Sequence, residues 1–424
     1  MKEGVFHRDC VDRGITVVGE EVPGAGSVSI GVWVRSGSRN ERREQSGLSH
    51  FIEHMVFKGT ARRDALEIAK SLECVGGHLD AFTSKEHTCF YARVLDEHLP
   101  LAVDALSDIV CHSLFDQRDI EKEKHVVLDE IRTLQDTPDD EIHDLFSQAI
   151  WKDHPLGRSV LGYEETVNGF NREGLLSFFT DNYFLSNIVV SVAGKFDYDA
   201  LLDLLGRSFT LPQIGTLVDG GPPRDYSRQV EVYERELSQE YVCLGTRGIS
   251  YSHDLRYPLL TLNVVMGGGM SSRLFQRVRE EEGLAYSVFS YSDFLKDSGL
   301  FCAFMGVSPS STVKALGIVL AEFEKARQLG LSVDEIQSAK AQLKGSLLLG
   351  LESVSNRMTR LAKSEIYCGR YVSVDELVSM IEDVTAETIA RAAELVLSRE
   401  NLSFVALGPC PRKEVLRLVQ APNT

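Results

Sequence analysis

Residues 47–60 read GLSHFIEHMVFKGT, a run with the apolar spacing of one face of a helix. At 100° per residue, one side of such a helix gathers its apolar side chains, namely Leu48, Phe51, Ile52, Met55 and Val56. The opposite side carries His50, Glu53 and His54, and Gly59 supplies a helix stop. The stretch therefore predicts an amphipathic helix that packs on a core and presents three titratable groups away from it.

The polar side of this helix suits a metal ion. His50 and His54, two imidazoles four residues apart on one face, can bind the same ion, and Glu53 can then reach a water molecule held there. The alternative is a solvated polar face, which is the commoner explanation of a single histidine, but the full H-x-x-E-H pattern is more specific. Because a catalytic zinc usually has three protein ligands and an open position, another ligand is expected elsewhere in the chain.

A second helix, predicted over residues 119–135, offers candidates for that ligand. Its apolar stripe consists of Ile120, Val127, Ile131 and Leu134. Glu123 and Glu130 project onto the border of this stripe, whereas Glu121 and Asp129 point away from it. Periodicity leaves Glu123 and Glu130 both open, either as a metal ligand or as a partly buried helix edge that makes local ion pairs.

The chain consists of two similar halves. The stretch LPQIGTLVDGGPPRDYS at 211–227 gathers proline and glycine between apolar-periodic regions, as a linker does. NIVVSVAG at 187–194 is echoed by NLSFVALG at 401–408, and KEHTCFYARV from Lys85 resembles KDSGLFCAFM from Lys296. The shared offset of about 210 residues indicates duplication of a whole domain, because short repeats have much smaller periods.

Each half mixes strands and helices without regular alternation. Strands are expected at 28–37 and 88–95, and helices at 64–75, 100–113 and 117–135. The predicted fold class is α+β, with two homologous domains that each pack a mostly antiparallel sheet with helices. The predicted boundaries are an N-terminal metal-binding domain at 1–212, a linker at 213–228 and a C-terminal domain without metal at 229–424.

Composition narrows the range of partners. The 424 residues carry a formal net charge of −17, which argues against nucleic acid and anionic membranes as partners. No stretch approaches the roughly 18 apolar residues of a membrane span, and the start of the chain lacks the apolar region of a secretion signal. The eight scattered cysteines suit a reducing compartment. We therefore expect a cytoplasmic protein without a disulfide framework or a thiolate metal site.

The chain resembles the insulinase/pitrilysin metallopeptidases, the inverzincins marked by H-x-x-E-H. Within them it is similar to the branch of short chains that includes the mitochondrial processing peptidase, and the resemblance extends over nearly all of the sequence. Four ordered blocks carry it: GLSHFIEHMVFKGT at 47–60, GGHLDAFTSKEHT at 76–88, EKEKHVVLDEI at 121–131 and SSRLFQRVREEEGLAYSV at 271–288.

The resemblance implies one zinc ion per chain, bound in the N-terminal half. Its ligands would be His50, His54 and Glu130, since relatives place the third ligand on a second helix before an isoleucine or similar residue. Glu123 matches an accessory glutamate that supports the site. Glu53 would be the general base that takes a proton from the attacking water.

The resemblance also implies an assembly. Arg279 and Tyr286 match residues that orient the substrate and stabilise the oxyanion, and Gly268 lies in a glycine run that matches a flexible loop near substrate entry. Relatives of this length pair two chains, so a homodimer is expected, in which Arg279 and Tyr286 serve the zinc site of the other chain. A heterodimer that divides these residues between two chains is less favoured, because this chain holds both sets.

Relatives bind substrate as a strand added to an exposed sheet edge, and the matching segment here contains Asp80, Ala81 and Phe82. Asp80 stands where many relatives have asparagine, and an ionised carboxylate cannot donate a hydrogen bond. The predicted function is a zinc-dependent endopeptidase of short or unfolded peptides, with presequence-like basic peptides as a substrate class. The alternative is a non-catalytic scaffold or partner subunit, because some relatives keep the fold and lose the chemistry.

Overall fold

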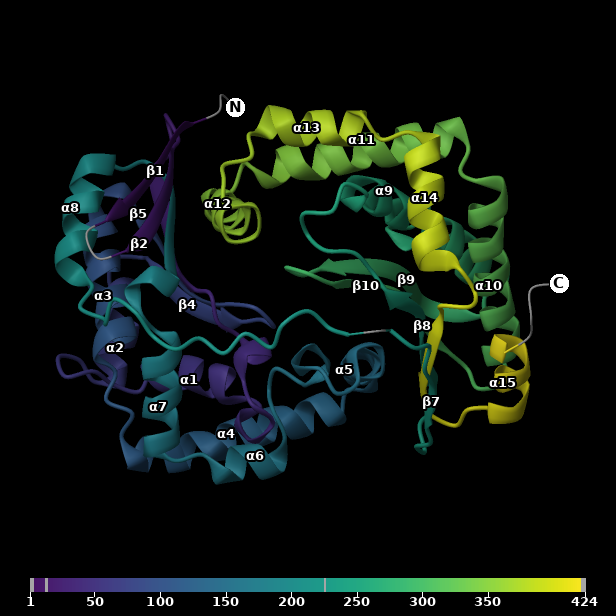
Figure 1. The fold of residues 1–424 in the computed structure, drawn as a ribbon, viewed down its shortest axis with the longest axis horizontal. Coiled ribbons are helices and arrows are strands. Elements are labelled where there is room, and N and C mark those ends of the chain that lie inside the picture. The colour runs from purple at the N-terminus through teal and green to yellow at the C-terminus, as the bar shows by residue number, and fades with distance from the viewer. Residues whose placement is uncertain (1–3, 12–13, 225, 421–424) are drawn as a thin grey trace. The chain divides into compact units, whose positions relative to one another are not determined.

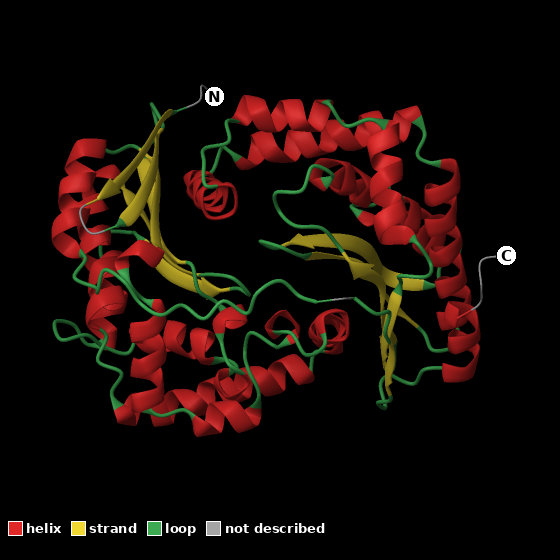
Figure 2. Cartoon of the chain, viewed as in Figure 1, coloured by secondary structure: helices red, strands yellow, loops and turns green. Residues whose placement is uncertain are grey.

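The computed structural model describes residues 4–11, 14–224 and 226–420, which divide into two compact units (Figure 1). The first unit takes its described residues from 1–132, 158–220 and 348–374. The second takes them from 133–157, 221–347 and 375–424. Each unit contains one sheet with helices on both of its faces (Figure 2).

The first unit is built on a sheet of six described strands in the order β1-β2-β6-β3-β5-β4. Their bounds are β1 Val5–Val11, β2 Ile15–Glu21, β3 Ser27–Val34, β4 His78–Thr83, β5 Thr88–Leu95 and β6 Ile188–Gly194. Neighbouring strands run antiparallel except β2 and β6, which run parallel. Among the described strands β4 has a neighbour on one side alone, so it forms an edge of the sheet.

Helices cover both faces of this sheet because its strands bury side chains on both sides. In β3, Val28, Ile30 and Val32 belong to the main core, whereas Trp33 belongs to a smaller cluster under α12. Helices α3 and α8 lie on the main-core face and α12 lies on the other (Figure 1). The helices of this unit are α1 Leu48–Val56, α2 Ala65–Glu73, α3 Leu99–His112, α4 Gln117–Gln135, α6 Glu164–Gly169, α7 Arg172–Asn182, α8 Tyr198–Ser208 and α12 Val354–Cys368.

The second unit has a sheet of five described strands in the order β7-β11-β8-β10-β9. Its strands are β7 Val230–Tyr233, β8 Glu240–Arg247, β9 Ala285–Phe294, β10 Gly299–Val307 and β11 Ser403–Leu407. Its helices are α5 Pro138–Trp151, α9 Arg256–Gly267, a π-helix at Phe275–Glu281, α10 Thr312–Leu329, α11 Val333–Gly350, α13 Val374–Glu382, α14 Ala386–Leu397 and α15 Arg412–Gln420. Helices α4, α11 and α13 run across the boundaries between the residue ranges of the two units.

The two sheets share one topology. If β7 is matched with β2, β11 with β6, β8 with β3, β10 with β5 and β9 with β4, the five strands follow the same order. The single parallel pair is also the same, since β7 and β11 run parallel as β2 and β6 do. The α+β class and the two homologous sheet-and-helix domains are therefore confirmed.

The two halves of the sequence exchange one helix each. Helix α5 precedes the predicted linker, yet it covers a face of the second sheet through residues such as Ile142 and Phe146. Helix α12 follows the linker, yet it covers the first sheet through Met358 and Leu361. The division at 212 and 228 into contiguous domains stays a prediction, while the compact units are discontinuous in sequence.

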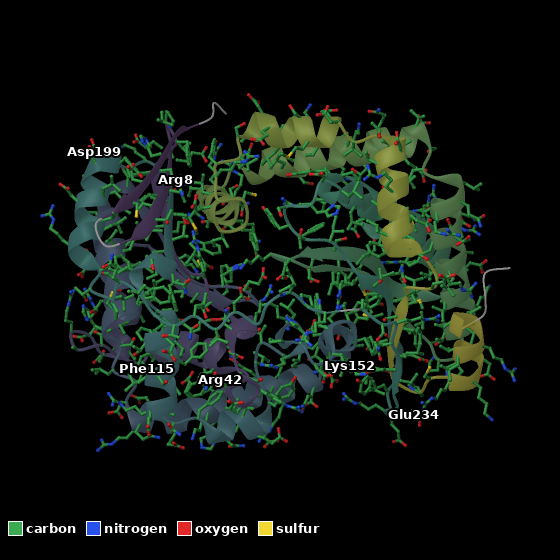
Figure 3. All side chains as sticks on the ribbon, in the orientation of Figure 1. Arg8, Arg42, Phe115, Lys152, Asp199 and Glu234 are labelled. Atoms are coloured by element: carbon green, nitrogen blue, oxygen red, sulfur yellow. The ribbon has the colours of Figure 1, made fainter. Side chains whose placement is uncertain are left out.

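Ion pairs and close packing hold α12 on the first sheet. Arg8 in β1 forms a bidentate pair with Glu365 of α12, with both N–O distances 2.9 Å (Figure 3 labels Arg8). The fully buried Glu20 in β2 accepts from Arg360 at 3.1 Å. At Gly31 in β3, a Cβ atom would lie 2.6 Å from the sulfur of Met358, so a larger residue there would require the Met358 side chain to move.

The predicted secondary structure agrees with these elements. Strand β5 and helix α4 have the predicted bounds, and β3, α2 and α3 begin and end within a few residues of them. In the part of the chain that the structure describes, no helix has the length and apolarity needed to cross a bilayer.

Candidate metal centre

The site is built on helix α1, whose apolar and polar sides divide as expected from the sequence. Leu48, Phe51, Ile52, Met55 and Val56 are all buried. Gly47 directly precedes the helix with a φ of 93°, and it has no side chain to cap the first turn. Instead the buried Glu41 accepts a hydrogen bond from the Gly47 N–H at 2.8 Å and one from the Ser49 N–H at 2.7 Å. These bonds hold the start of α1 in place.

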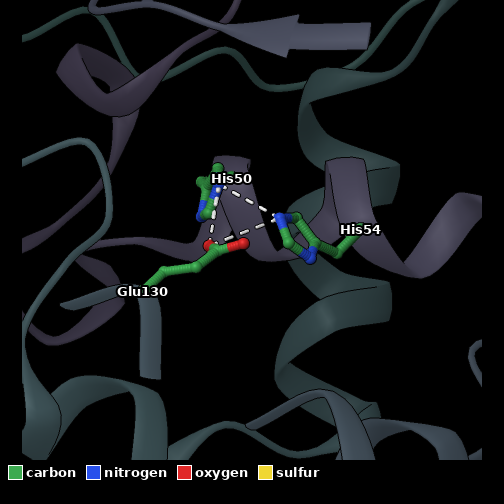
Figure 4. Close-up of side chains that lie close together, drawn as sticks. All are labelled: His50, His54 and Glu130. Atoms are coloured by element: carbon green, nitrogen blue, oxygen red, sulfur yellow. Dashed lines mark hydrogen bonds and ion pairs between the residues drawn. The ribbon is translucent and has the colours of Figure 1, made fainter. Parts of the chain in front are cut away.

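His50 and His54 from α1 meet Glu130 from α4 (Figure 4). The two Nε2 atoms lie 3.2 Å apart. Oε2 of Glu130 lies 3.7 Å from Nε2 of His50 and 3.6 Å from Nε2 of His54. In the described residues, these side chains are the one group of three or more whose ligand atoms converge in this way, within 4.8 Å of one another.

The three side chains fit a divalent cation. Oε2 of Glu130 is buried and has no hydrogen-bond partner among the described residues. It faces two imidazole nitrogens, and a buried anionic oxygen without a partner is costly unless a cation or a donor satisfies it. Two imidazoles and one carboxylate are a ligand set that zinc takes in catalytic sites.

Burial favours the neutral form of His50, which is the form that binds a metal. Burial and, to a smaller extent, the neighbouring His54 together lower the pKa of His50 to about 3, against the opposing effect of Glu123. His50 is therefore neutral near pH 7, and a metal ligand must be deprotonated. Sequence reasoning identified the residue, but its burial came from the packing around α1.

The other ring nitrogen of His54 contacts Glu123. Nδ1 of His54 lies 2.8 Å from Oε1 of Glu123, and Oε2 of Glu123 lies 2.7 Å from Nζ of Lys58. Burial alone would raise the pKa of Glu123, but its bonds to His54 and Lys58 lower it below the ordinary value. An ionised Glu123 accepts a hydrogen bond from Nδ1–H, and in that tautomer the Nε2 lone pair of His54 is directed at the candidate metal position. Lys58 was not singled out in the sequence, where nothing marks it except its place in the first block.

Glu53 projects from the same side of α1 as the two histidines. Its carboxylate accepts a hydrogen bond from the Thr83 hydroxyl at the end of β4. Burial raises the pKa of Glu53 above its ordinary value. Sequence spacing gave no signal for Thr83, because the contact depends on how β4 packs against α1.

Three of the predicted substrate-binding residues, Asp80, Ala81 and Phe82, lie in edge strand β4. Asp80 Oδ1 accepts from the N–H of Ala81 at 2.8 Å, and Oδ2 accepts from the Tyr91 hydroxyl at 3.1 Å. The ring of Phe82 packs edge-on against Trp33, with 5.5 Å between centroids. The Asp80 carboxylate is thus engaged within its own sheet.

Arg279, Tyr286 and Gly268 belong to the second unit. Arg279 lies in the π-helix, and its guanidinium carbon is 4.8 Å from the centroid of the Tyr286 ring. Tyr286 is 79% exposed and stands at a register shift of β9, where Ser287 pairs with Gly306 and Ala285 with Val307. A π-turn and a bulge are both local irregularities that recur at functional sites.

Gly268 ends helix α9 with a φ of −82°. A Cβ atom at this position would lie 2.7 Å from Cα of Val264. Glycine is therefore required here by the close approach of the helix backbone.

The chain matches known proteins along most of its length. Residues 16–164 match the family described as insulinase (peptidase family M16), and residues 169–343 match the peptidase M16 inactive domain. The "Uncharacterized zinc protease YmxG" of Bacillus subtilis is 39% identical over 405 residues, which are 96% of this chain and 98% of that one. A protein of Streptomyces coelicolor that is also named a zinc protease is 38% identical over 428 residues, 99% of this chain and 93% of its own.

Solved structures agree on the fold. A peptidase M16 inactive domain from Pseudomonas fluorescens has a TM-score of 0.90 at 19% identity, with 96% of this chain and 98% of that chain covered. A protease from Helicobacter pylori has a TM-score of 0.89 at 21% identity, with 96% and 100% covered. His50, His54 and Glu130 all fall inside the first matched segment. The chain therefore belongs to the insulinase family, peptidase family M16, and is a zinc metalloprotease.

Proposed function

We propose that the protein is an endopeptidase in which His50, His54 and Glu130 hold the zinc and Glu53 is the general base. The observation that carries the proposal is the convergence of three ligand atoms from α1 and α4 within 4.8 Å of one another. A fourth group, Glu53, projects from the same side of α1. Convergence of residues from positions 50, 54 and 130 depends on the packing of two helices, so it is independent support for the pattern in the sequence.

The chemistry divides between the metal and the chain. Zinc, when bound, supplies Lewis-acid polarisation of the scissile carbonyl and activates water. Glu53 accepts one proton from the attacking water as the oxygen bonds to the carbonyl carbon. When the C–N bond breaks, Glu53 returns that proton to the leaving amine. Glu123 keeps the ring of His54 in one orientation through its bond to Nδ1.

Edge strand β4 supports a substrate that binds as an extended peptide. Main-chain groups along a free sheet edge can pair with any extended segment, which demands little of its sequence. A folded protein cannot offer such a segment without unfolding locally. We therefore infer short or unfolded peptides as substrates, and the net charge of −17 favours basic ones.

We infer a homodimer in which Arg279 and Tyr286 of one copy complete the zinc site of the other. Supporting this, the π-helix and the bulge display the two side chains together, with Tyr286 exposed. An exposed tyrosine beside an arginine is suited to hydrogen-bond a developing oxyanion.

A cytoplasmic location is proposed from the cysteines. Among the described residues, Cys89, Cys243 and Cys302 are buried thiols that pack as small core residues. Unpaired buried thiols are typical of proteins in reducing compartments.

The experiment that tests the proposed activity combines metal analysis with peptide cleavage. Purified protein is expected to contain one zinc per chain and to cleave members of a peptide library. The Glu53→Gln variant is expected to retain zinc and to lose activity by about 100-fold or more, because a general base contributes on that scale. Glu121→Gln is the matched control, since Glu121 is exposed on α4 and pairs with Lys124. Unchanged activity in Glu53→Gln would refute the mechanism.

A second candidate function is a non-catalytic scaffold or partner subunit. The match of residues 169–343 to a domain described as inactive favours it. The ligand atoms gathered within residues 16–164 count against it. Zinc-loaded protein that cleaves no peptide in a diverse library, alone or mixed with other chains, would support the scaffold.

A further inference from the structure

The Thr83 hydroxyl is placed to act on Glu53. Thr83 is the last residue of β4, and alternation along the strand puts it on the same face as Leu79 and Ala81. Leu79 and Ala81 pack against the main core that includes the apolar side of α1. From this face, the Thr83 hydroxyl donates a hydrogen bond to Oε2 of Glu53. The donor and the acceptor therefore meet where the edge strand crosses α1.

The neighbouring hydroxyl leaves the Thr83 proton directed at Glu53. Thr88 is the cross-strand partner of Thr83, and the two Oγ1 atoms lie 3.4 Å apart. Thr88 is fully buried and donates its own proton to the carbonyl of Ser36 at 3.1 Å. Thr83 can thus donate either to the neutral oxygen of Thr88 or to the carboxylate of Glu53. The carboxylate is the stronger acceptor, because bonds to a charged acceptor are roughly twice as strong.

The position of the donor is set by the backbone of the hairpin. The register pairs Thr83 with Thr88, Phe82 with Cys89 and Ala81 with Phe90. The β-branched side chain of Thr83 has few rotamers, so its Oγ1 has little freedom relative to β4. Glu53, by contrast, has a long side chain that needs a partner to hold its carboxylate in one place.

We propose that Thr83 is a positioning residue that holds the carboxylate of Glu53 in place and couples it to edge strand β4. This inference rests on the proposed function, in which Glu53 is the base and β4 receives the peptide. One strand then both aligns the substrate backbone and aims the group that takes the proton. The same strand therefore positions both the bound peptide and the carboxylate of Glu53.

The consequence is a specific kinetic signature. Without the hydroxyl, the Glu53 carboxylate samples other orientations, and misplacement of a reacting group by about 1 Å costs roughly 100-fold in rate. Substrate binding depends on the backbone edge of β4, which a change of the Thr83 side chain leaves intact. Zinc binding depends on His50, His54 and Glu130. We therefore expect kcat to fall by about 10- to 100-fold in Thr83→Val, with KM and zinc content unchanged.

The test compares Thr83→Val, Thr83→Ser and wild type in zinc content, thermal melting, kcat and KM. Valine keeps the branched shape and removes the hydroxyl, whereas serine keeps the hydroxyl and is expected to restore kcat to within a few-fold of wild type. Thr312→Val is the matched control. Thr312 is buried, and like that of Thr83 its hydroxyl donates to a glutamate carboxylate, Oε2 of Glu240 at 3.0 Å, in the second unit. It is expected to lower the melting temperature and leave kcat unchanged.

Two failures of this test can be told apart. If wild type cleaves peptides and Glu53→Gln does not, a wild-type kcat in Thr83→Val overturns the role of Thr83 alone. Loss of zinc in Thr83→Val, or a serine variant as impaired as the valine variant, overturns it as well, because either points to a structural effect. If Glu53→Gln is as active as wild type, the proposed function fails, and the role of Thr83 fails with it.

Discussion

Oε1 of Glu123 lies 2.8 Å from Nδ1 of His54, on the nitrogen opposite to the one that faces Glu130. The two glutamates of α4 thus meet the same imidazole ring at its two nitrogens. They occupy positions seven residues apart, about two turns, which puts them on one side of the helix. In the proposed site, Glu123 orients the ring and Glu130 faces the zinc.

Replacing Glu123 tests this division of roles. Glu123→Gln is expected to weaken zinc binding about 10- to 100-fold, because the amide is a poorer acceptor for the Nδ1 proton of His54. Competition with a chromophoric chelator measures the affinity. Lys58→Met is expected to change the affinity in the same direction by less, since it removes the cation at 2.7 Å from Glu123 but keeps the carboxylate. Equal zinc affinity in wild type and Glu123→Gln would contradict the orienting role.

Replacing Glu130 removes a proposed ligand. Glu130→Gln is expected to reduce the zinc content of purified protein well below one per chain and to abolish cleavage, because an amide oxygen is a far weaker ligand than a carboxylate. Removal of zinc by a chelator is expected to abolish activity in wild type, and added zinc should restore it. Metal analysis after gel filtration gives the content. Asp129→Asn is the control, because Asp129 is exposed and pairs with Arg132 at 2.8 Å.

Mixing of inactive variants tests the composite site. Glu53→Gln and Arg279→Ala are each expected to be nearly inactive alone. In a homodimer whose sites take Arg279 from the partner, random exchange of equal amounts makes half of the dimers mixed, and each mixed dimer has one intact site. Activity should then recover to about a quarter of the wild-type value. Sedimentation of the mixture confirms that dimers form. Absence of recovery after proven exchange would exclude this arrangement.

Glu41 makes the stability of the fold depend on pH. Burial raises the pKa of Glu41 from an ordinary value of 4.5 to about 8, although bonds from the N–H groups of Ser49 and Gly47 act in the opposite direction. Between these two pH values the folded chain binds a proton that the unfolded chain has lost. The contribution of Glu41 to the unfolding free energy is therefore fully present below pH 4.5 and decreases as pH rises to about 8.

Urea unfolding of wild type and Glu41→Gln at several pH values checks this. The wild-type unfolding free energy, minus that of the variant, is expected to fall by a few kcal/mol, on the order of 1.4 kcal/mol for each unit of pKa shift. The glutamine cannot titrate, so the subtraction isolates Glu41. A difference that stays constant or rises across the range would show that Glu41 is ionised in the folded chain.

The local pattern of apolar and polar residues was sufficient to predict the helices and strands of the fold and the half of the site that lies on α1. The spacing of Leu48, Phe51 and Val56 predicted α1 and its buried side, because a helix repeats every 3.6 residues whatever surrounds it. The same spacing placed His50, Glu53 and His54 on one face. The shared offset of the two halves predicted two similar sheets, because a repeat of that length within one chain indicates a duplicated domain.

The other half of the site depended on packing between distant segments. Periodicity left Glu123 and Glu130 equivalent; the resemblance to a family distinguished them, and the structure puts one at each nitrogen of His54. Apart from its place in the block at 76–88, Thr83 carries no mark in the sequence, because its hydroxyl meets Glu53 only after β4 has packed against α1.

The sequence by itself determined which residues form helices and strands, which of their sides are apolar, and that two histidines and a glutamate share one face. Only the tertiary structure decided which carboxylate faces those histidines, which hydroxyl donates to Glu53, and that α5 and α12 each complete the sheet of the other half. The physical reason is the distance along the chain between the residues that interact. Helical and strand periods arise from bonds between near neighbours in the chain, whereas a metal position requires groups from residues 50, 54 and 130 to meet in space.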